Sequence, residues 1–190
     1  MKLAIKLIRS KRRTISLEII PTGQVLVRVP KYMSEAEIHA FLESKSSWLS
    51  KHLQRKEKDK ELLQEEGKFT EREIERLVKL AKMVIPEKVS YYARLMGVSY
   101  GRITIRNQKT RWGSCSREGN LNFNCLLMMT PPEVLDYVVI HELAHRMEMN
   151  HSSRFWMQVE KVIPDYRKQR KWLKEHGSGL MLRMHGSADV

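Results

Sequence analysis

Hydrophobic and polar residues alternate along the first thirty positions in the manner of β-strands. Three runs rich in β-branched and aliphatic residues occur there: LAIKLI (3–8), TISLEII (14–20) and QVLVRVP (24–30). Pro21-Thr22-Gly23 separates the second run from the third and is typical of a turn. The pattern therefore predicts a small β-rich unit in this part of the chain.

From Ser34 onward the hydrophobic spacing is that of a helix. Glu37 follows Ser34 by three positions, which is the spacing of a capping box at a helix start. The segment 54–66, QRKEKDKELLQEE, is almost entirely charged and is either an exposed helix or a tether. Gly67 ends this segment, so residues 1–66 are expected to form a small basic N-terminal unit of strands and a charged helix.

A second capping box, from Thr70 to Glu73, precedes a long amphipathic helix. Its apolar positions at helical spacing are Ile74, Leu77, Val78, Ala81, Val84 and Ile85. Pro86 either kinks this helix or divides it in two. Residues 67–178 are expected to form the main domain, and residues 179–190 a flexible C-terminal tail.

The middle of the main domain contains a short strand followed by a strong helix start. Between Asn120 and Cys125, three apolar residues alternate with three asparagines, as in a strand with one buried and one polar face. Cys125 is therefore expected in the core rather than at a metal. Thr130 and Glu133 bracket two prolines in the form of a capping box, so a helix is predicted to begin at Thr130.

This predicted helix carries the sequence HELAH, from His141 to His145. Side chains four residues apart on a helix point about 40° from each other, one turn apart, so the two imidazoles can bind one tetrahedral zinc ion. Another divalent metal would be held in the same way. Glu142 would then stand beside the metal, placed to take a proton from the metal-bound water. The sequence thus predicts a metal-activated hydrolase.

A zinc enzyme normally needs a third protein ligand. His151 follows His141 by ten residues and would lie about 80° off the metal face of an unbroken helix, so the chain must turn before it. Asn150 tolerates the left-handed backbone of a helix end and can supply that turn. Glu148 is the rival ligand, because it returns to the face of His141 within about 20°. It can contact the metal or orient His145.

Charge indicates the kind of partner. The net charge is +13 at pH 7 with a pI near 9.9, which favours anionic partners such as phosphates, nucleic acid or acidic surfaces. Basic residues cluster between 2 and 13 and again between 167 and 174, and each cluster is either a solvated face or a binding surface.

Two further features concern the setting of the chain. No segment approaches the run of about 20 apolar residues that spans a bilayer, and the first residues do not form a signal peptide. Cys115 and Cys125 are the only cysteines, so a disulfide framework is not expected and a reduced, cytoplasmic setting fits best. No membrane partner is expected, and the oligomeric state stays open.

A series of short motifs runs through the main domain. In chain order they are Arg111-Trp-Gly-Ser-Cys-Ser116, Gly119-Asn-Leu, Asn124, Leu126, Pro131, Asp136-Tyr-Val138, His141-Glu-Leu-Ala-His145, Asn150-His-Ser152, Phe155-Trp156, Pro164-Asp-Tyr166 and Trp172-Leu173. Together they resemble the YgjP-like metallopeptidase family, which is related to the SprT-like and WLM zincins. The resemblance implies a zincin-like α+β fold: a small antiparallel or mixed sheet with a long backing helix and an HExxH metal helix.

By the same resemblance the metal ligands are His141, His145 and His151, and Glu142 is catalytic. Position 148 is not one that we associate with the family's ligands, which favours an indirect or neutral role for Glu148. The three-histidine spacing is also that of the metzincins, although Glu148 stands where those enzymes have a turn-forming glycine.

Fold and metal leave the substrate open. If the substrate is a polypeptide, we expect it to lie as an added β-strand along Leu121 to Leu126, near Asn122, with the metal polarising its carbonyl. An oxyanion donor is also needed, and Tyr166 and His176 are candidates that the sequence alone does not place near the metal.

Two alternatives follow from the resemblance and the charge. Some YgjP-like proteins are described as UTP pyrophosphatases, and Lys109, Arg111 and Arg154 are suitable phosphate contacts, although Arg111 is equally suited to stabilising the fold. SprT-like relatives act on DNA-bound proteins, so the basic clusters are alternatively a nucleic-acid surface. Trp112 and Trp156 would then be stacking groups, although a core position is the more common role.

Overall fold

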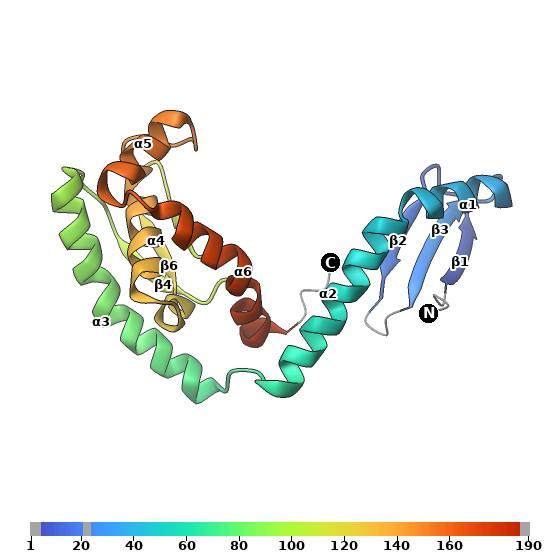
Figure 1. The fold of residues 1–190 in the computed structure, drawn as a ribbon, viewed down its shortest axis with the longest axis horizontal. Coiled ribbons are helices and arrows are strands. Elements are labelled where there is room, and N and C mark those ends of the chain that lie inside the picture. The colour runs from blue at the N-terminus through green and yellow to red at the C-terminus, as the bar shows by residue number, and fades with distance from the viewer. Residues whose placement is uncertain (1–4, 21–23, 187–190) are drawn as a thin grey trace. The chain divides into compact units, whose positions relative to one another are not determined.

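The computed structural model describes residues 5–20 and 24–186, drawn in Figure 1. The chain folds as two units that divide between Glu65 and Glu66, and each is described by itself. Within the described ranges, none of the helices has both the length and the apolar character that crossing a bilayer requires.

The first unit is a three-stranded sheet covered by helices. Its elements are β1 (Ile5–Ser10), β2 (Ser16–Ile19), β3 (Val25–Pro30), α1 (Glu35–Ser44) and α2 (Ser46–Glu65). The strand order is β1-β3-β2, with β1 parallel and β2 antiparallel to β3. Alternate valines of β3 pack with Ile38 and Leu49 of the helices, so the predicted β-rich unit is confirmed. The turn expected at 21–23 lies outside the described residues.

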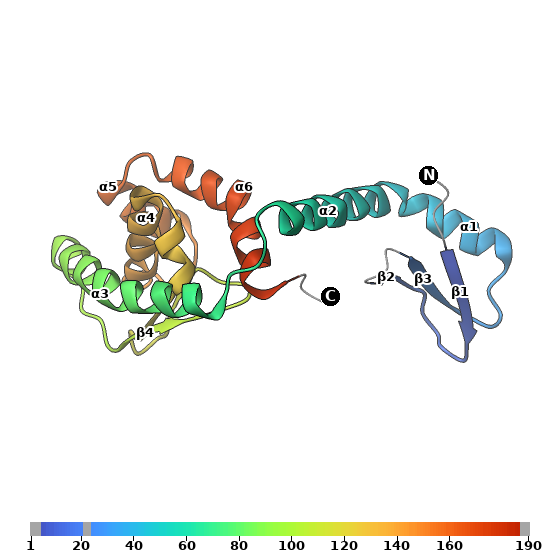
Figure 2. The same cartoon turned by 90° about the horizontal axis from the view of Figure 1, so that it is seen from below.

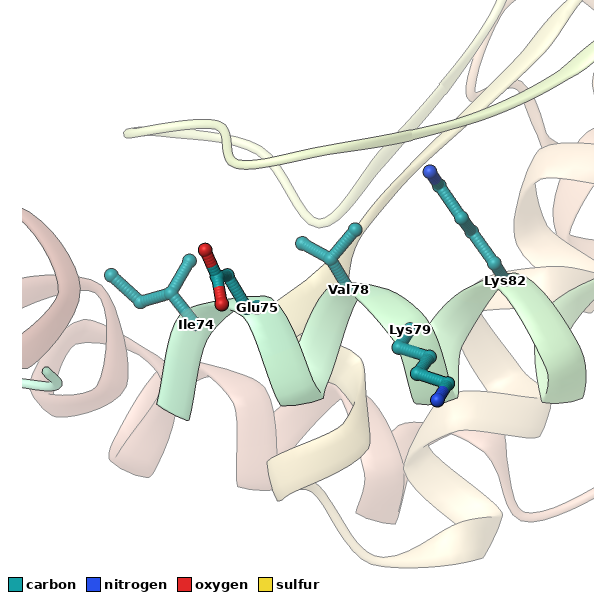
Figure 3. Close-up of a pocket in the computed structure, with 5 residues that line it drawn as sticks. All are labelled: Ile74, Glu75, Val78, Lys79 and Lys82. Atoms are coloured by element: carbon teal, nitrogen blue, oxygen red, sulfur yellow. The ribbon is translucent and has the colours of Figure 1, made fainter. Parts of the chain in front are cut away.

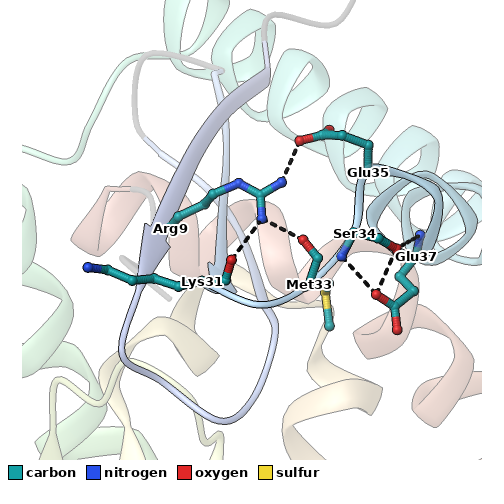
Figure 4. A network of polar contacts seen from close by, with 6 residues as sticks. All are labelled: Arg9, Lys31, Met33, Ser34, Glu35 and Glu37. Atoms are coloured by element: carbon teal, nitrogen blue, oxygen red, sulfur yellow. Dashed lines mark hydrogen bonds and ion pairs between the residues drawn. The ribbon is translucent and has the colours of Figure 1, made fainter.

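The start of α1 shows why local sequence predicts this helix so well. The Ser34 hydroxyl accepts a hydrogen bond from the Glu37 backbone amide, and the Glu37 carboxylate accepts one from the Ser34 amide at 2.8 Å, as Figure 4 shows. Arg9 of β1 adds a link from the sheet by donating to the Met33 carbonyl and pairing with Glu35. The charged segment that follows is a helix rather than a tether, since α2 runs through Glu65.

The second unit contains the predicted mixed sheet and its long backing helix. Its elements are α3 (Glu71–Met96), β4 (Ile103–Arg106), β5 (Gly113–Cys115), β6 (Leu121–Asn124), the 3₁₀ helix η1 (Cys125–Met129), α4 (Pro132–Ala144), α5 (Ser153–Val162) and α6 (Tyr166–His185). The strand order is β4-β6-β5, with β4 parallel and β5 antiparallel to the central strand β6. The fold is therefore α+β, as expected.

The long helix α3 begins at the capping box of Thr70 and Glu73 and ends at Gly97, whose φ is 65°. Only glycine adopts such a left-handed conformation without strain, so Gly97 fits a helix end. Pro86 lies inside the helix but does not divide it. One face of α3 is buried along its whole length and provides a wall for the core.

The helix α4 lies at the centre of the second unit. It packs against α3, α5, α6 and β5, and Figures 1 and 2 show it enclosed by the three helices. Nine of its thirteen residues are buried, which explains why its sequence is apolar nearly all round. A helix held from several sides is a rigid support for a functional site.

Two local predictions on either side of η1 need correction. The strand predicted between Asn120 and Cys125 is confirmed as β6, but it ends at Asn124, which is buried rather than on a polar face. Its side-chain amide donates to the carbonyls of Gln108 and Arg111 at 2.8 and 3.1 Å. The buried side chain thus provides hydrogen-bond partners for two loop carbonyls. The predicted core position of Cys125 is confirmed, because its side chain is fully buried.

The start of α4 also differs from the prediction. Pro131, not Thr130, is the N-cap residue, and no side chain caps the helix. The Thr130 hydroxyl instead donates to the Leu127 carbonyl at 2.8 Å, closing the end of η1. A preceding 3₁₀ turn therefore competes with the helix for the same hydroxyl.

The prediction of a flexible tail at residues 179–190 is wrong for most of this segment. The helix α6 continues through His185, and Leu182 and Met184 are buried. Met184 belongs to the core of the second unit, and Leu180 and Met181 pack against that core. Residues 187–190 lie outside the described part of the chain.

Candidate metal centre and active site

Three histidines converge at the end of α4. His141 and Glu142 lie in the last turn of the helix, which ends at Ala144, and His145 is its C-cap residue. The ring centroids of His141 and His151 are 4.9 Å apart, and those of His145 and His151 are 4.8 Å apart. One nitrogen from each of the three rings lies within 4.8 Å of the other two.

The chain turns earlier than the sequence suggested. The backbone amide of Glu148 donates to the Ala144 carbonyl at 3.0 Å, so a tight turn closes directly after α4. No residue except glycine has a positive φ in the described ranges, so Asn150 does not adopt the left-handed conformation expected of it. Its carbonyl instead accepts from the Ser152 amide at 2.7 Å, and the Ser152 side chain caps α5. His151 is held between these two turns.

The rival ligand Glu148 contributes through its backbone. Its carbonyl oxygen lies 3.1 Å from Nδ1 of His145, which fixes that ring and leaves Nε2 free for a metal. The Glu148 carboxylate is not part of the cluster of candidate ligands among the described residues. The structure therefore brings His151, rather than this carboxylate, to His141 and His145.

The protonation of the histidines fits metal binding. Burial lowers the pKa of His141 to about 3, and burial is also the main cause of the lowered pKa of His145. Both rings are therefore neutral at pH 7 and offer a lone pair. Nε2 of His141 lies 3.0 Å from Nε2 of His151, close to the separation of about 3.3 Å expected for two ligands of a tetrahedral zinc ion. The donor set thus suits a divalent metal such as zinc.

Glu142 is a buried carboxyl group, only 5% exposed. Burial raises its pKa to about 8, and the positive charge of Arg111 acts in the opposite direction. The sheet approaches it very closely, because a Cβ atom at Gly113 would lie 2.6 Å from Oε1 of Glu142. The glycine at the start of β5 is therefore needed for the edge strand to pass the carboxylate.

A pocket of about 240 Å³ adjoins these groups. It is lined by Arg111, Trp112, Gly113, Tyr137, Val138, His141, Glu142 and Leu173. Sequence reasoning did not assign Tyr137 to the site, although it precedes His141 by one helical turn and so shares its face. Burial raises the pKa of Tyr137 to about 12, so its phenol remains a hydrogen-bond donor at neutral pH.

A larger hollow of about 310 Å³ lies along α3. Figure 3 shows its lining, which is Ile74, Glu75, Val78, Lys79 and Lys82. It is formed by one helix and contains no histidine or cysteine. This larger hollow therefore has no histidine or cysteine with which to bind a metal. The smaller pocket beside the histidines is the candidate site.

An aromatic shell surrounds the three histidines. The ring of Phe155 lies between 4.6 and 4.9 Å from each of the three imidazoles. Trp156 stacks on His151 at 5.7 Å, Tyr166 stacks on Trp156 at 5.1 Å, and the Arg170 guanidinium lies 4.8 Å from the Trp156 ring. Trp156 therefore packs within the core, and it also fixes the exposed third histidine.

Neither of the two oxyanion donors suggested by the sequence lines the pocket. Tyr166 is buried behind Trp156, whereas His176 is exposed and stacks on Trp172 at 4.7 Å. Tyr137 is the tyrosine that the fold places in the pocket wall. The sequence suggested the wrong side chains because tertiary packing of α6 against α4 decides which residues reach the pocket. The spacing of residues along α6 does not reveal this packing.

The strand expected to receive a polypeptide is the wrong one. β6 is paired on both sides, with β4 and β5, so no further strand can be added along Leu121 to Leu126. The Asn122 amide donates to Ser114 at 3.2 Å and accepts from Arg106 at 3.4 Å. Asn122 thus links the three strands and does not line the pocket.

The three basic residues expected at the substrate occupy different places. Arg111 lies in the pocket wall with His141 and Glu142. Lys109 and Arg154 are exposed and do not line the pocket. The structure therefore brings one of the three cations to the candidate site.

An HExxH helix packed against a small mixed sheet, with a third histidine brought back by the next turn, defines the class as a zincin-like α+β fold of the metallopeptidase type. The chain belongs to the YgjP-like metallopeptidase family, whose domain matches residues 13–78 and 65–176. No match was found among curated proteins.

Two solved structures are similar to part of the chain. They are the metallopeptidase zymogens abylysin of Pyrococcus abyssi, with 24% identity and a TM-score of 0.45, and jannalysin of Methanocaldococcus jannaschii, with 19% identity and a TM-score of 0.43. Each similarity covers 48% of this chain and 94% of the other.

Proposed function

We propose that the protein is a zinc-dependent peptidase, with His141, His145 and His151 as metal ligands and Glu142 as general base. The observation that carries this proposal is the cluster of three imidazoles next to a buried carboxyl group. Three nitrogen ligands with an open fourth position are typical of a catalytic rather than a structural zinc site. Membership of a metallopeptidase family supports the peptide bond as the target.

A bound zinc ion supplies Lewis-acid activation of a water molecule and of the scissile carbonyl. The chain's own residues carry the proton. A bound cation would favour the ionised form of Glu142, which would then accept this proton from the attacking water and pass it to the leaving amine. Tyr137 stays protonated in the same pocket wall and is our candidate donor to the developing oxyanion.

The polypeptide is proposed to add to the sheet at β5. This strand pairs with β6 on one side, and its first residue, Gly113, lies against Glu142. A substrate strand added at this edge would carry its backbone past the carboxylate. The expectation of strand addition is thus kept but moved from the central strand to an edge strand.

Hydrolysis of a nucleoside triphosphate such as UTP is the second candidate. Arg111 in the pocket wall favours it, since a guanidinium suits a phosphate as well as a carboxylate. The third reading, a SprT-like protease or nucleic-acid-binding protein, has less support. Trp112 and Trp156, its proposed stacking groups, pack against the core.

A cytoplasmic setting remains our proposal for the compartment. Cys115 and Cys125 are both free thiols, and unpaired cysteines are usual where the environment is reducing.

The deciding experiment compares zinc-loaded wild-type protein with Glu142→Gln on denatured polypeptides and on UTP. We expect peptide fragments from the wild type, and full zinc content but at least about 100-fold slower turnover in Glu142→Gln. Pyrophosphate released from UTP without any peptide cleavage would instead establish the nucleotidase. A variant that lost zinc, or kept full activity, would contradict the role of Glu142.

A further inference from the structure

The pocket beside the histidines has two kinds of wall. Trp112, Val138 and Leu173 make it largely apolar, and Arg111 is the one cationic group in its lining. Its volume of about 240 Å³ is below the roughly 300–1,000 Å³ of pockets that hold whole drug-sized ligands. A space of this size suits a single side chain of a larger substrate.

Arg111 is the arginine that the fold places in the wall of this pocket. The arginines that pair with a carboxylate among the described residues are Arg9, Arg28, Arg167 and Arg183, and Arg111 is not one of them. No ion pair engages the Arg111 side chain in the part of the chain that the structure describes, although its charge reaches the buried Glu142. A guanidinium that has no ion-pair partner, at the wall of a largely apolar pocket, is suited to bind a carboxylate.

A second positive charge lies near the histidines. Arg170 rests on the ring of Trp156 and is one of the groups that disfavour a charge on His141. Arg170 does not line the pocket, so it adds to the positive electrostatic potential at the site but does not contact a bound substrate. The net charge of +13 acts in the same direction over the whole chain. The site is therefore electrostatically suited to an acidic substrate.

We propose, on the basis of the peptidase function, that this pocket selects a substrate residue with an apolar stem and a terminal carboxylate, which Arg111 binds. A glutamate side chain fits this description best. A free C-terminal carboxylate has the same chemistry and is distinguished below. Arg111 is thus a specificity-determining residue, and the peptidase prefers bonds next to acidic residues.

The first test maps the bonds that zinc-loaded protein cleaves in a denatured polypeptide and then uses matched peptides. The peptides differ at one position next to the cut, as Glu, Gln or Lys, each with a free or an amidated C-terminus. We expect kcat/KM to be about tenfold higher for Glu than for Gln, as a charge-assisted hydrogen bond provides. A preference that followed the free C-terminus instead would identify that carboxylate as the ligand.

Substitutions at Arg111 make the assignment specific. Arg111→Gln should remove the preference for Glu over Gln, and Arg111→Glu should reverse it toward Lys, with zinc content and melting temperature unchanged. Arg111→Lys should keep part of it, because lysine provides the charge but not the two-pronged geometry. Arg72→Gln is the matched control, since Arg72 is exposed at the start of α3.

A binding measurement separates this inference from the peptidase function. Glutarate should bind zinc-loaded Glu142→Gln by calorimetry, and adding Arg111→Gln should weaken it about tenfold. Glutarate binding that depends on Arg111, without cleavage of any peptide by the wild type, would overturn the peptidase proposal alone. Equal cleavage of Glu and Gln peptides, with glutarate binding indifferent to Arg111, would overturn the pocket assignment alone.

Discussion

At the scale of single residues, Gly113 is where β5 passes directly against the Glu142 side chain. A methyl group there would overlap the Glu142 carboxylate, so Gly113→Ala should displace this side chain. We expect kcat to fall about 100-fold, the cost of moving a catalytic group by roughly 1 Å, while zinc content stays full. Steady-state kinetics with metal analysis tests this.

Ser114→Ala is the control for the neighbouring position on the same strand. Ser114 accepts a hydrogen bond from Asn122 and does not line the pocket, so its loss should leave kcat nearly unchanged. If Gly113→Ala were as active as this control, Glu142 would have room that the structure does not show.

The buried Glu142 also makes the stability of the metal-free protein depend on pH. Its pKa is raised from 4.5 to about 8, so the folded protein binds the proton more tightly than the unfolded chain, and stability falls as pH rises through this range. His141 acts oppositely, because its pKa is lowered from 6.5 to about 3 and its contribution is complete above pH 6.5.

Between pH 6.5 and 8 the effect of Glu142 should therefore be seen alone. We expect the melting temperature measured with a chelator to fall by a few degrees, corresponding to about 1–2 kcal/mol, and this slope to be absent in Glu142→Gln. A slope of the same size in both proteins would assign the titration to another group.

Residue spacing predicted which side chains of α4 share one face, but not all the residues around them. His141, His145 and Glu142 follow from local helix geometry, and the structure brings His151 to them. Arg111 was one of several candidates until the pocket singled it out. Which cation reaches a pocket depends on contacts between distant segments, and these leave little trace in local spacing.

At the scale of elements, the end of α4 is tied to two loops by Arg146. Its side chain donates to the carbonyls of Ser99 and Arg117 at 2.9 and 3.0 Å, and Gly119 leaves room for the guanidinium. Because His145 is the adjacent residue, this link helps to fix the second ligand. Arg146→Ala should therefore weaken zinc affinity about tenfold, the usual cost of removing a group that supports a ligand.

Zinc affinity from competition with a chromogenic chelator is the measurement. Arg146→Lys should recover part of the affinity, since one ammonium nitrogen replaces the two guanidinium nitrogens that reach the two carbonyls. Unchanged affinity in Arg146→Ala would show that the packing of α4 alone holds His145.

The elements that were predicted well from the sequence are determined by residues close to them in the chain. The capping boxes at Ser34 and Thr70 lie within four residues of what they cap, and both form as predicted. The wrong predictions at Thr130 and Asn150 share another cause. Each concerns a polar residue with more than one local partner, and the neighbouring turns decide which partner it takes.

At the scale of the whole molecule, every group of the candidate site belongs to the second unit. The candidate ligands, Glu142 and the pocket walls all lie beyond Glu66, where this unit begins. Its own core runs from Phe69 to Met184. The chemistry is therefore expected to depend on this unit alone.

A protein that begins at Glu66 tests this division. Arg183, near the end of α6, donates to Glu66 at 2.6 Å and to the Gly67 carbonyl at 3.1 Å, and its own carbonyl accepts from the Phe69 amide at 3.1 Å. Starting at Glu66 keeps all three contacts. We expect this protein to melt cooperatively, to bind zinc within about twofold of the full chain and to retain peptide cleavage, because the ligands and pocket walls are all present.

A second shortened protein, beginning at Thr70, is the matched comparison. It keeps the capping box of α3 but loses every contact between α6 and the segment 66–69, including the Arg183 guanidinium on the Phe69 ring. Losing an ion pair, two hydrogen bonds and a buried aromatic ring should lower the melting temperature by about 5 °C or more. If the protein from Glu66 failed to bind zinc while the full chain did, the first unit would be part of the active enzyme and the division proposed here would be wrong.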